Sequence, residues 1–359
     1  MSHRKQSLKK AVGVVLATGV LAAAMAPAQA ALLPTQTYKP LITSGDLPDS
    51  PQARVDGNTS DSPFSGVVSL YISKNGGGYI CSGALVGKRS VVSAGHCVDS
   101  DGKGTLVDIN QPGTSVQVVF NSDGDYNDVI RASKVSMDAG YQGFGNCPAG
   151  VSSFCVNDDV SVVTLERDAP ASAKIYKIAT NALLAGTRIT MAGYGTSGDG
   201  VNGYYIEPEF NVKRSGANYV DYFETDDEGV AGRNEVFVAD FDGAGQDTHC
   251  TYFDICTPQL ANDVESGIGG GDSGGPSFVK MYGELMLVAN NTFSTRYFNS
   301  QVDGTFGTAF GGIVLSSYTD YLLAATAGDV TFVPEPGSFA LFGLGALALF
   351  GARRRSIKK

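Results

Sequence analysis

Two short segments of the chain carry residues that could act together as a nucleophile and its base. The first is the glycine-rich stretch GGGDSGGP at positions 269–276, in which Ser273 follows Asp272. A serine hydroxyl becomes an effective nucleophile only when a neighbouring base takes its proton. The glycines leave room for backbone N–H groups, which stabilise the oxyanion formed when a serine attacks a carbonyl group. The pattern therefore indicates nucleophilic catalysis at Ser273.

The expected base is His96, one of three histidines in the chain. His3 belongs to the N-terminal leader, and His249 adjoins Cys250 in a long polar stretch, where we expect a solvated loop histidine. His96 follows the apolar residues 84–93, which predict two short strands around a Gly-Lys-Arg turn. A buried core histidine is the alternative interpretation, and it leaves the serine motif unexplained.

A catalytic triad also needs a carboxylate that fixes the histidine tautomer and stabilises the imidazolium. The segment NDDVSVVTL at 157–165 places Asp158 and Asp159 at the start of a predicted β-branched strand. One of the two is expected only to form the turn into this strand. The chain order His, Asp, Ser excludes the orders Ser, Asp, His and Asp, His, Ser that two other hydrolase folds use.

Across residues 55–325 the chain resembles serine endopeptidases of the trypsin/chymotrypsin type. SAGHC (93–97) resembles the family's histidine box, GDSGGP (271–276) its serine box, and DDVSVVTL (158–165) its aspartate segment, which assigns the functional carboxylate to Asp159. ITMAGYGTSG (189–198) and VLSSYTDYL (314–322) are similar to the start of its second barrel and to its closing strand and terminal helix. The resemblance implies an all-β fold of two packed six-stranded antiparallel β-barrels with a short C-terminal helix, and the triad in the cleft between the barrels.

The resemblance also implies which residues bind the substrate. The oxyanion hole would consist of the N–H groups of Gly271 and Ser273. The substrate pocket would contain Gly267, Ile268, Thr292, Phe293 and Ser294. Trypsin-like enzymes carry an aspartate for Lys and Arg side chains where this chain has glycine. We therefore expect an apolar or small substrate residue before the cleaved bond (P1), with an aromatic wall from Phe293. Glu265 is close enough in sequence to enter this pocket.

A junction before the domain resembles the family's activation site. Val55 and Gly57 match the usual pattern Ile-Val-Gly-Gly, whereas Asp56 and Asn58 depart from it. Cleavage after Arg54 would release residues 31–54 as a pro-segment and pair the Val55 ammonium group with Asp272, which would set the oxyanion hole. A plain linker with a coincidental Arg-Val pair is the alternative.

The two ends of the chain indicate export. Residues 1–30 combine four basic residues, an apolar run and Ala-Gln-Ala, which is typical of a signal peptide removed by signal peptidase. After a linker at 326–338 with the motif Pro-Glu-Pro, residues 339–352 form a short apolar segment, expected to be a transmembrane helix, and 353–359 a basic cytoplasmic tail. This end resembles the PEP-CTERM sorting signal of Gram-negative bacteria and implies recognition by an exosortase-type enzyme, with a simple tail anchor as the alternative. Either way the domain faces outward, in the cell envelope, on the surface or in the medium.

The six cysteines fit an oxidising compartment. The resemblance implies a disulfide between Cys81 and Cys97. Closeness in sequence suggests Cys147–Cys155 and Cys250–Cys256, although other pairings are open. No cluster of cysteines and histidines has metal-binding spacing, so neither a metal nor a cofactor is expected. Asp99–Gly102 and Asp123–Asp125 have calcium-like spacing without a complete EF-hand loop, so structural calcium and exposed acidic turns both remain open.

The chain carries a formal net charge of −10, and removing the four positive charges of residues 1–30 and the five of residues 339–359 leaves −19 between them. Such an acidic region has no electrostatic footprint for nucleic acid. The stretch 201–256 is longer than a minimal domain needs, and either shapes substrate access or is a solvated decoration. The sequence thus predicts an exported, monomeric serine endopeptidase that acts on proteins or peptides. A catalytically silent binding or adhesion module and an esterase-like hydrolase are the alternatives.

Overall fold

The computed structural model describes residues 42–124, 128–144, 156–180, 183–225, 227 and 232–334. By residue contacts the chain divides into the units Met1–Gln36 and Thr37–Lys359, and every described residue belongs to the second. The predicted signal peptide, the predicted apolar segment 339–352 and the basic tail lie outside the described residues. Within the described ranges no helix is long and apolar enough to cross a membrane.

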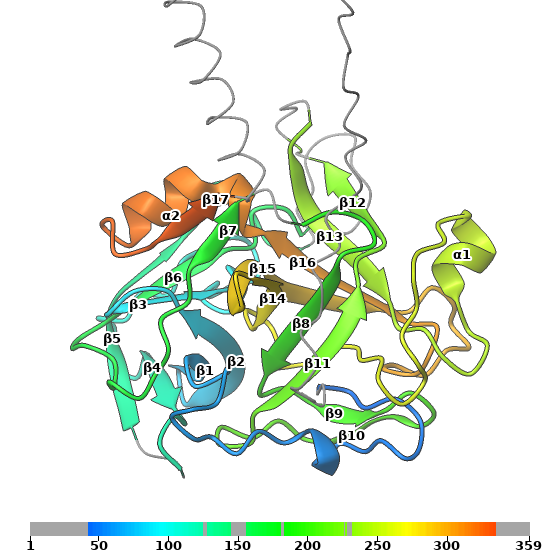
Figure 1. The fold of residues 1–359 in the computed structure, drawn as a ribbon. Coiled ribbons are helices and arrows are strands. Elements are labelled where there is room, and N and C mark those ends of the chain that lie inside the picture. The colour runs from blue at the N-terminus through cyan, green and yellow to red at the C-terminus, as the bar shows by residue number, and fades with distance from the viewer. Residues whose placement is uncertain are drawn as a thin grey trace, which may run out of the picture. The chain divides into compact units, whose positions relative to one another are not determined.

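The first half of the domain is a closed six-stranded antiparallel barrel, as predicted. Its strand order is β1-β2-β3-β6-β5-β4, and pairing of β1 with β4 closes it (Figure 1). Alternate residues of the first strand, Val68, Leu70 and Ile72, are fully buried and point into the barrel core. Val67 and Ser69 on the other face are also buried, and Val67 packs in the core shared with the sheet, so the first half of this strand is covered on both faces. The strands are β1 (Val67–Lys74), β2 (Gly77–Leu85), β3 (Ser90–Ser93), β4 (Ser115–Phe120), β5 (Asp128–Met137) and β6 (Ser161–Leu165).

The second half is an open nine-stranded sheet, so the prediction of a second closed six-stranded barrel is wrong. Its main path runs β11-β8-β14-β15-β16-β13-β12, and no pairing joins the edge strands β11 and β12 within the described chain. The two residues between them, Val220 and Asp221, donate instead to the carbonyls of Thr187 and Val238, so the two edges meet only at a corner. The strands of this path are β8 (Arg188–Gly193), β11 (Arg214–Tyr219), β12 (Tyr222–Thr225), β13 (Asn234–Asp240), β14 (Pro276–Met281), β15 (Glu284–Thr295) and β16 (Ala309–Val314).

Short elements complete the sheet and the surface. The strands β7 (Ile178–Thr180) and β17 (Phe332–Pro334) pair with each other in parallel, and β7 joins them to β15. A separate hairpin is formed by β9 (Ser197–Asp199) and β10 (Gly203–Ile206). The predicted C-terminal helix is present as the 3-10 turn η2 (Leu315–Tyr318) followed by α2 (Thr319–Ala325). The other helical segments are η1 (Gln52–Arg54) and α1 (Thr248–Phe253).

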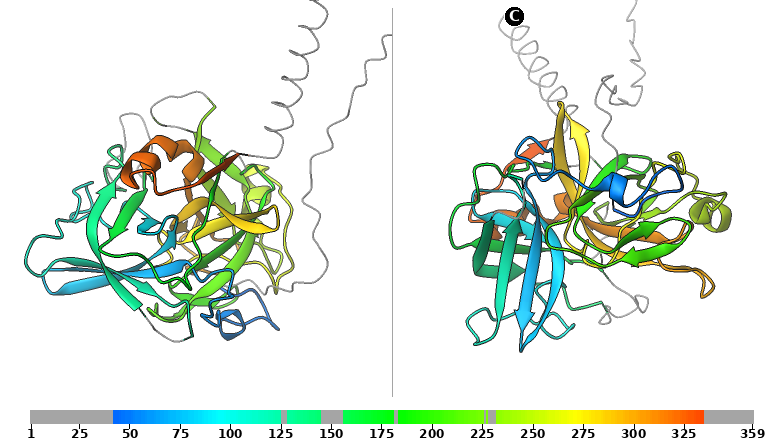
Figure 2. Two further views of the ribbon diagram at one scale, coloured as in Figure 1. Left: turned by 60° about the vertical axis from the view of Figure 1, so that its left-hand side comes forward. Right: turned by 90° about the horizontal axis from the view of Figure 1, so that it is seen from below.

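A shared apolar core joins the barrel to the sheet. Val92 and Val162 of the barrel belong to the same buried cluster as Ala192, Phe278 and Leu287 of the sheet. Both views in Figure 2 show the blue-to-cyan barrel strands beside the green and yellow strands of the sheet. Burial of this cluster therefore fixes the end of β3 and the start of β6 next to the turn that precedes β14.

Candidate active site

His96 and Asp159 meet because β3 and β6 are paired neighbours, with Ser93 opposite Ser161. The Asp159 carboxylate is fully buried, and its Oδ2 lies 2.8 Å from His96 Nδ1. Its Oδ1 accepts the backbone N–H of His96 at 2.6 Å. A Cβ atom on Gly95 would lie 3.1 Å from the same Oδ1 atom, so glycine before the histidine leaves space for the carboxylate. Asp159 thus holds both the ring and the backbone of His96.

An asparagine of β15 braces this pair. The Nδ2 group of Asn290 donates to the Asp159 carbonyl at 3.1 Å and to the Ser93 carbonyl at 3.3 Å, which ties together the two segments that carry the acid and the base. Ser161 adds a further link through its hydroxyl, which donates to the Ala94 carbonyl at 2.7 Å. Sequence reasoning missed Asn290, because a lone polar residue in a strand carries no motif.

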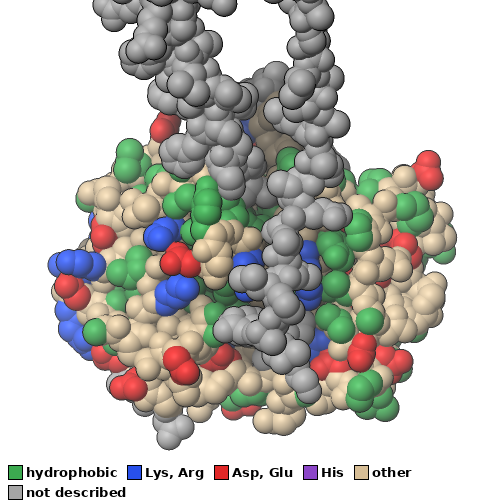
Figure 3. Space-filling view, viewed as in Figure 1, with side chains coloured by type: hydrophobic (Ala, Val, Ile, Leu, Met, Phe, Trp, Pro, Cys, Tyr) green, Lys and Arg blue, Asp and Glu red, His purple; other side chains and the backbone are tan. Residues whose placement is uncertain are grey.

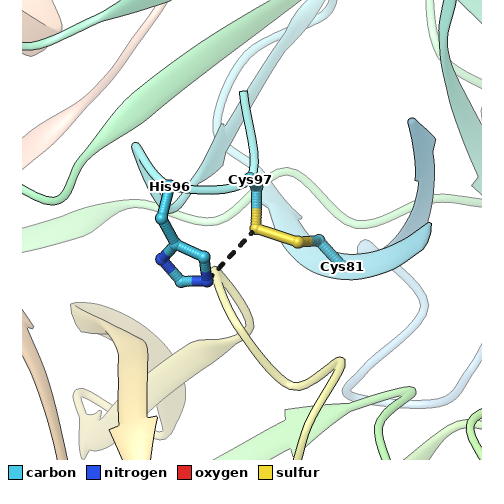
Figure 4. A group of neighbouring side chains, drawn as sticks. All are labelled: Cys81, His96 and Cys97. Atoms are coloured by element: carbon cyan, nitrogen blue, oxygen red, sulfur yellow. Dashed lines mark hydrogen bonds between the residues drawn. A yellow bond between two sulfur atoms is a disulfide. The ribbon is translucent and has the colours of Figure 1, made fainter. Parts of the chain in front are cut away.

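Ser273 lies in a tight turn directly against the histidine segment. Gly274 has φ +77°, and a Cβ atom there would lie 2.0 Å from Ser93 Oγ, so only glycine fits. The Ser273 carbonyl accepts the N–H of Ser82 at 2.8 Å and lies 3.7 Å from Cys97 Sγ. That sulfur is 3.9 Å from His96 Nε2, and Figure 4 shows this edge of the imidazole facing the Cys81–Cys97 disulfide.

The Ser273 hydroxyl makes no hydrogen bond to any described residue. Contacts between nucleophile and base are often loose without substrate and tighten in the reacting complex. One face of the imidazole is covered, because the rings of His96 and Phe144 lie 4.8 Å apart. The side chain of His96 remains 21% exposed, so the imidazole is partly accessible from outside.

Two backbone donors beside Ser273 are available to an anion. The N–H groups of Gly271 and Ser273 donate to no acceptor among the described residues. The turn is held from behind, because the Gly271 carbonyl accepts the hydroxyl of Ser82 at 2.8 Å. Both residues are partly exposed, so an anion could reach the two N–H groups, which is the arrangement that an oxyanion hole requires.

Asp272 is fully buried beneath this turn. Its carboxylate accepts the N–H groups of Gly195 and Gly269, each at 2.8 Å. Burial raises the pKa of Asp272 to about 7, and these two hydrogen bonds and the nearby Arg214 oppose the rise. The carboxylate therefore has its charge only partly compensated in the intact chain.

Arg54 and Val55 of the predicted activation junction contact residues other than Asp272. Arg54 is 1% exposed, and its guanidinium group bonds the side chains of Asp49 and Ser266. Val55 forms an isolated β-bridge with Arg214. In the intact chain the backbone of Val55 thus pairs with Arg214, whose charge acts on the Asp272 carboxylate that Val55 was predicted to meet.

The predicted pocket residues Gly267 and Ile268 lie among aromatic side chains. A Cβ atom on Gly267 would meet the ring of Phe241 at 3.4 Å. The hydroxyl of Tyr204 donates to the Ile268 carbonyl, and the same hydroxyl is hydrogen-bonded to the side chain of Ser294. Burial raises the pKa of Tyr204 to about 12, so it stays a neutral donor. Sequence reasoning missed Tyr204 and Phe241, which both belong to the stretch 201–256.

Thr292 and Phe293 lie at the end of β15, where the strand has an irregular register against β16. The ring of Phe293 packs over Gly311, because a Cβ atom there would be 2.6 Å from Phe293 Cζ. Thr292 is buried. Glu265 does not reach this group of residues with its carboxylate, which instead accepts the N–H groups of Leu260 and Asp242.

Two of the three expected disulfides are present, Cys81–Cys97 and Cys250–Cys256, and Cys147 and Cys155 lie outside the described residues. The disulfide next to His96 leaves no thiolate there for a metal ion. The prediction of a solvated His249 is wrong. This histidine is fully buried, with Nδ1 2.6 Å from Asp221 Oδ2.

Comparisons with known proteins agree with this geometry. The family model described as Trypsin matches residues 55–297, and the model of the PEP-CTERM protein-sorting motif matches residues 332–355. None of the curated proteins gives a significant match. The first match spans more than half of the chain and includes the histidine, aspartate and serine segments that the fold brings together. The chain therefore belongs to the trypsin family.

Proposed function

We propose that this protein is an exported serine endopeptidase that hydrolyses peptide bonds through an acyl-enzyme intermediate. The observation that carries the proposal is the pairing of His96 with the buried Asp159, beside a serine turn whose amide donors have no acceptor in the described part of the chain. A binding module has no need of a carboxylate fixed on the far side of the imidazole. Membership of the trypsin family supports the same activity.

In the proposed mechanism each residue acts at one defined atom. Ser273 Oγ attacks the carbonyl carbon while His96 Nε2 takes the hydroxyl proton, and Asp159 keeps the other ring proton on Nδ1. The carbonyl oxygen becomes an oxyanion that accepts the N–H groups of Gly271 and Ser273. His96 then gives its proton to the leaving amine, and the C–N bond breaks. A water molecule attacks the acyl-enzyme by the same route and releases the acid.

We propose that the substrate residue before the cleaved bond is small or apolar. The ring of Phe241 bounds the region around Gly267, and the ring of Phe293 covers Gly311 on the neighbouring strand β16. Since the carboxylate of Glu265 is engaged by backbone N–H groups, the described pocket residues offer no free acid to a Lys or Arg side chain.

We propose that the C-terminal segment directs the protein to the cell surface. The PEP-CTERM motif implies export and recognition by an exosortase-type sorting enzyme in a Gram-negative bacterium. Removal of residues 1–30 by signal peptidase and transient anchoring through residues 339–352 belong to the same proposal. On the face seen in Figure 3, described basic side chains are interspersed with acidic ones, which suits a soluble exported surface.

Activation by proteolysis is the remaining part of the proposal. A new ammonium group at Val55 would reach Asp272 only after the segment leaves its bridge with Arg214. Cleavage after Arg54 also requires exposure of a guanidinium group that is buried against Asp49 and Ser266. We therefore expect slow cleavage at this junction in the folded chain.

A chain that begins at Ile42 is a second candidate for the active form. Ile42 is buried, its carbonyl accepts the hydroxyl of Ser197, and the next amide donates to the Gly267 carbonyl at 3.3 Å. Each of these partners lies two positions from a residue whose N–H binds the Asp272 carboxylate. An ammonium group at Ile42 would thus arise beside the two segments that hold the carboxylate.

The test is labelling of the full-length chain with a fluorophosphonate probe, beside a Ser273→Ala variant and with the N-terminus sequenced before and after labelling. Labelling that disappears in the variant supports the nucleophile, and the N-terminus of the labelled species decides between Val55, Ile42 and an unprocessed chain. Cleavage of ester but not of peptide substrates would indicate the esterase alternative. Absence of labelling in a chain that begins at Val55 or at Ile42 would indicate a silent binding module.

A further inference from the structure

A second group of charged side chains lies apart from the triad, at the end of β13 and in the loop that leads to α1. Four carboxylates in this region, Asp221, Asp240, Asp242 and Glu265, are at most 5% exposed. Asp247, half-buried, caps α1 by accepting the N–H of Cys250 at 2.8 Å. Figure 1 shows α1 and its loop beyond the end of β13, away from β3 and β6. Burial of so many carboxylates needs a compensating partner.

Part of this need is met by His249. Its Nδ1 lies 2.6 Å from Asp221 Oδ2, and its Nε2 lies 2.7 Å from the hydroxyl of Tyr297. Its backbone N–H donates to Asp240 Oδ2 at 2.8 Å. Both ring nitrogens are therefore occupied, so His249 offers no lone pair to a metal ion.

Asp242 is left without compensation. It is 5% exposed, and its Oδ1 atom is fully buried without a hydrogen-bond partner among the described residues. The charges of Asp240, Glu265, Asp247 and Asp221 act on it. Every charge that acts on this group is negative. A buried carboxylate in such surroundings is destabilising unless a cation joins it.

We propose that Asp240, Asp242 and Asp247 bind a calcium ion. One oxygen of each carboxylate can be chosen so that all three lie within 4.8 Å of one another. Oxygens bound to one Ca²⁺ at about 2.3–2.6 Å are at most about 5 Å apart, so the three atoms fit a single ion. The donor set consists of oxygen only, which favours Ca²⁺ over zinc or copper. The loop residues 244–246 are exposed, and water can complete the coordination from that side.

The acidic loop at Asp99 provides a contrast within the same chain. Its carboxylate accepts the N–H groups of Asp101, Gly102 and Gly104 at 2.9–3.0 Å. Asp101 likewise accepts from Lys103 and Thr105. This loop satisfies its own carboxylates through backbone donors, although its sequence spacing resembles that of calcium loops. It therefore serves as the matched control.

The proposed ion would also act on the substrate pocket. Phe241 lies between two of the ligands in sequence, and its ring packs against Gly267 and against Phe306, with the two rings 4.7 Å apart. Fixing Asp240 and Asp242 would hold Phe241 in place. This consequence for catalysis rests on the proposed function, whereas binding of the ion does not, so the experiment measures binding and stability.

The experiment uses the full-length chain with Ser273→Ala, which prevents self-digestion, after treatment with EGTA. Isothermal titration should detect one Ca²⁺ per chain with a Kd of about 10⁻⁵–10⁻³ M, and Ca²⁺ should raise the Tm by several degrees. Asp242→Asn should weaken binding at least about tenfold because it removes one ligand charge. Without Ca²⁺ the same variant should be as stable as its parent or more stable, since it relieves repulsion. A purely structural role for Asp242 would not produce this combination.

Asp247→Asn is the second variant, and Asp101→Asn is the control that should bind Ca²⁺ like its parent. The proposal is overturned if the parent binds no Ca²⁺ at about 10 mM, well above the range of extracellular sites. It is also overturned if both ligand variants keep the parent's affinity, or if Asp101→Asn removes the binding. Equal affinity for Mg²⁺ and Ca²⁺ would contradict the assignment of the ion.

Discussion

Asp159→Asn is the substitution that most directly tests the proposed catalytic geometry. The carboxylate oxygens accept two separate donors, the backbone N–H and the ring Nδ1–H of His96, at 2.6 and 2.8 Å. An asparagine has one oxygen and one NH₂ group, so it can accept from only one of these donors. If the NH₂ group faces the ring, Nδ1 must become the acceptor and the proton moves to Nε2. If it faces the backbone, two donors oppose each other.

The first orientation disables the base, whereas the second keeps the tautomer and costs folding stability. In the first, Nε2 already carries a proton and cannot take that of Ser273, and the expected loss of catalysis is about 10⁴-fold, or about 5.5 kcal/mol of transition-state stabilisation. In the second, a buried N–H group loses its acceptor, which costs about 1–3 kcal/mol of folding stability. Because the asparagine retains the shape of the aspartate, we expect the variant to fold and to lose activity.

The assay is the second-order rate of labelling by the fluorophosphonate probe, which needs no knowledge of the natural substrate. Asp158→Asn is the matched control. It is the adjacent carboxylate, and its φ of +62° is a conformation that asparagine tolerates. We expect the control to react within about tenfold of the parent. A labelling rate of Asp159→Asn within tenfold of the parent, with unfolding unchanged, would refute the assigned role of Asp159.

Three further predictions follow from burial and contact. Burial raises the pKa of Asp272 from 3.8 to about 7. Because the folded state then binds this proton more tightly than the unfolded state, ionisation of Asp272 in the intact chain should lower the free energy of unfolding by at most about 4 kcal/mol as the pH rises from about 4 to 7. Asp272→Asn should flatten this fall in urea unfolding, and an unchanged slope would contradict the pKa. Phe293→Ala should uncover Gly311 and raise the kcat/KM ratio of phenylalanine over alanine at P1 at least about tenfold, in a series of peptide substrates. An unchanged ratio would remove Phe293 from the pocket. Gly274→Ala should destabilise the fold by more than about 3 kcal/mol, whereas Gly76→Ala, with a similar φ and open space, should cost about 1 kcal/mol. Equal losses in denaturant unfolding would argue against the close packing of the serine turn.

The sequence could predict those parts of the site whose residues stand in short, contiguous motifs. Ser273 and His96 each stand in a short motif whose neighbours are required by the same chemistry, so their positions can be read without the fold. The assignment of Asp159 over Asp158 came from a family resemblance, and the structure pairs Asp159 with the histidine. Asn290 could not be found in this way, because its contact with Asp159 depends on the register of β15 against β14.

The wrong prediction for His249 has a related cause. Its neighbours in sequence are polar, which favours an exposed loop, but three of its partners come from other elements. Asp221 precedes β12, Asp240 ends β13 and Tyr297 follows β15, and together they occupy the ring and the backbone of the histidine. Tertiary compensation of a buried polar group leaves no local signal in the sequence. The missing pairing between β11 and β12 could not be predicted either, because strand pairing is a tertiary property.

Two residues of the stretch 201–256 contact predicted pocket residues, which favours a role in substrate access over a solvated decoration. Tyr204 from its beginning bonds the Ile268 carbonyl, and Phe241 from its middle packs against Gly267. Both side chains are largely or fully buried, so removing them would leave cavities directly behind the predicted pocket residues. Of the two carboxylates on either side of Phe241, Asp240 accepts the N–H of His249, whereas Oδ1 of Asp242 has no hydrogen-bond partner among the described residues. The ring of Phe241 would then couple substrate specificity to ion binding. We therefore expect removal of Ca²⁺ to change the P1 preference.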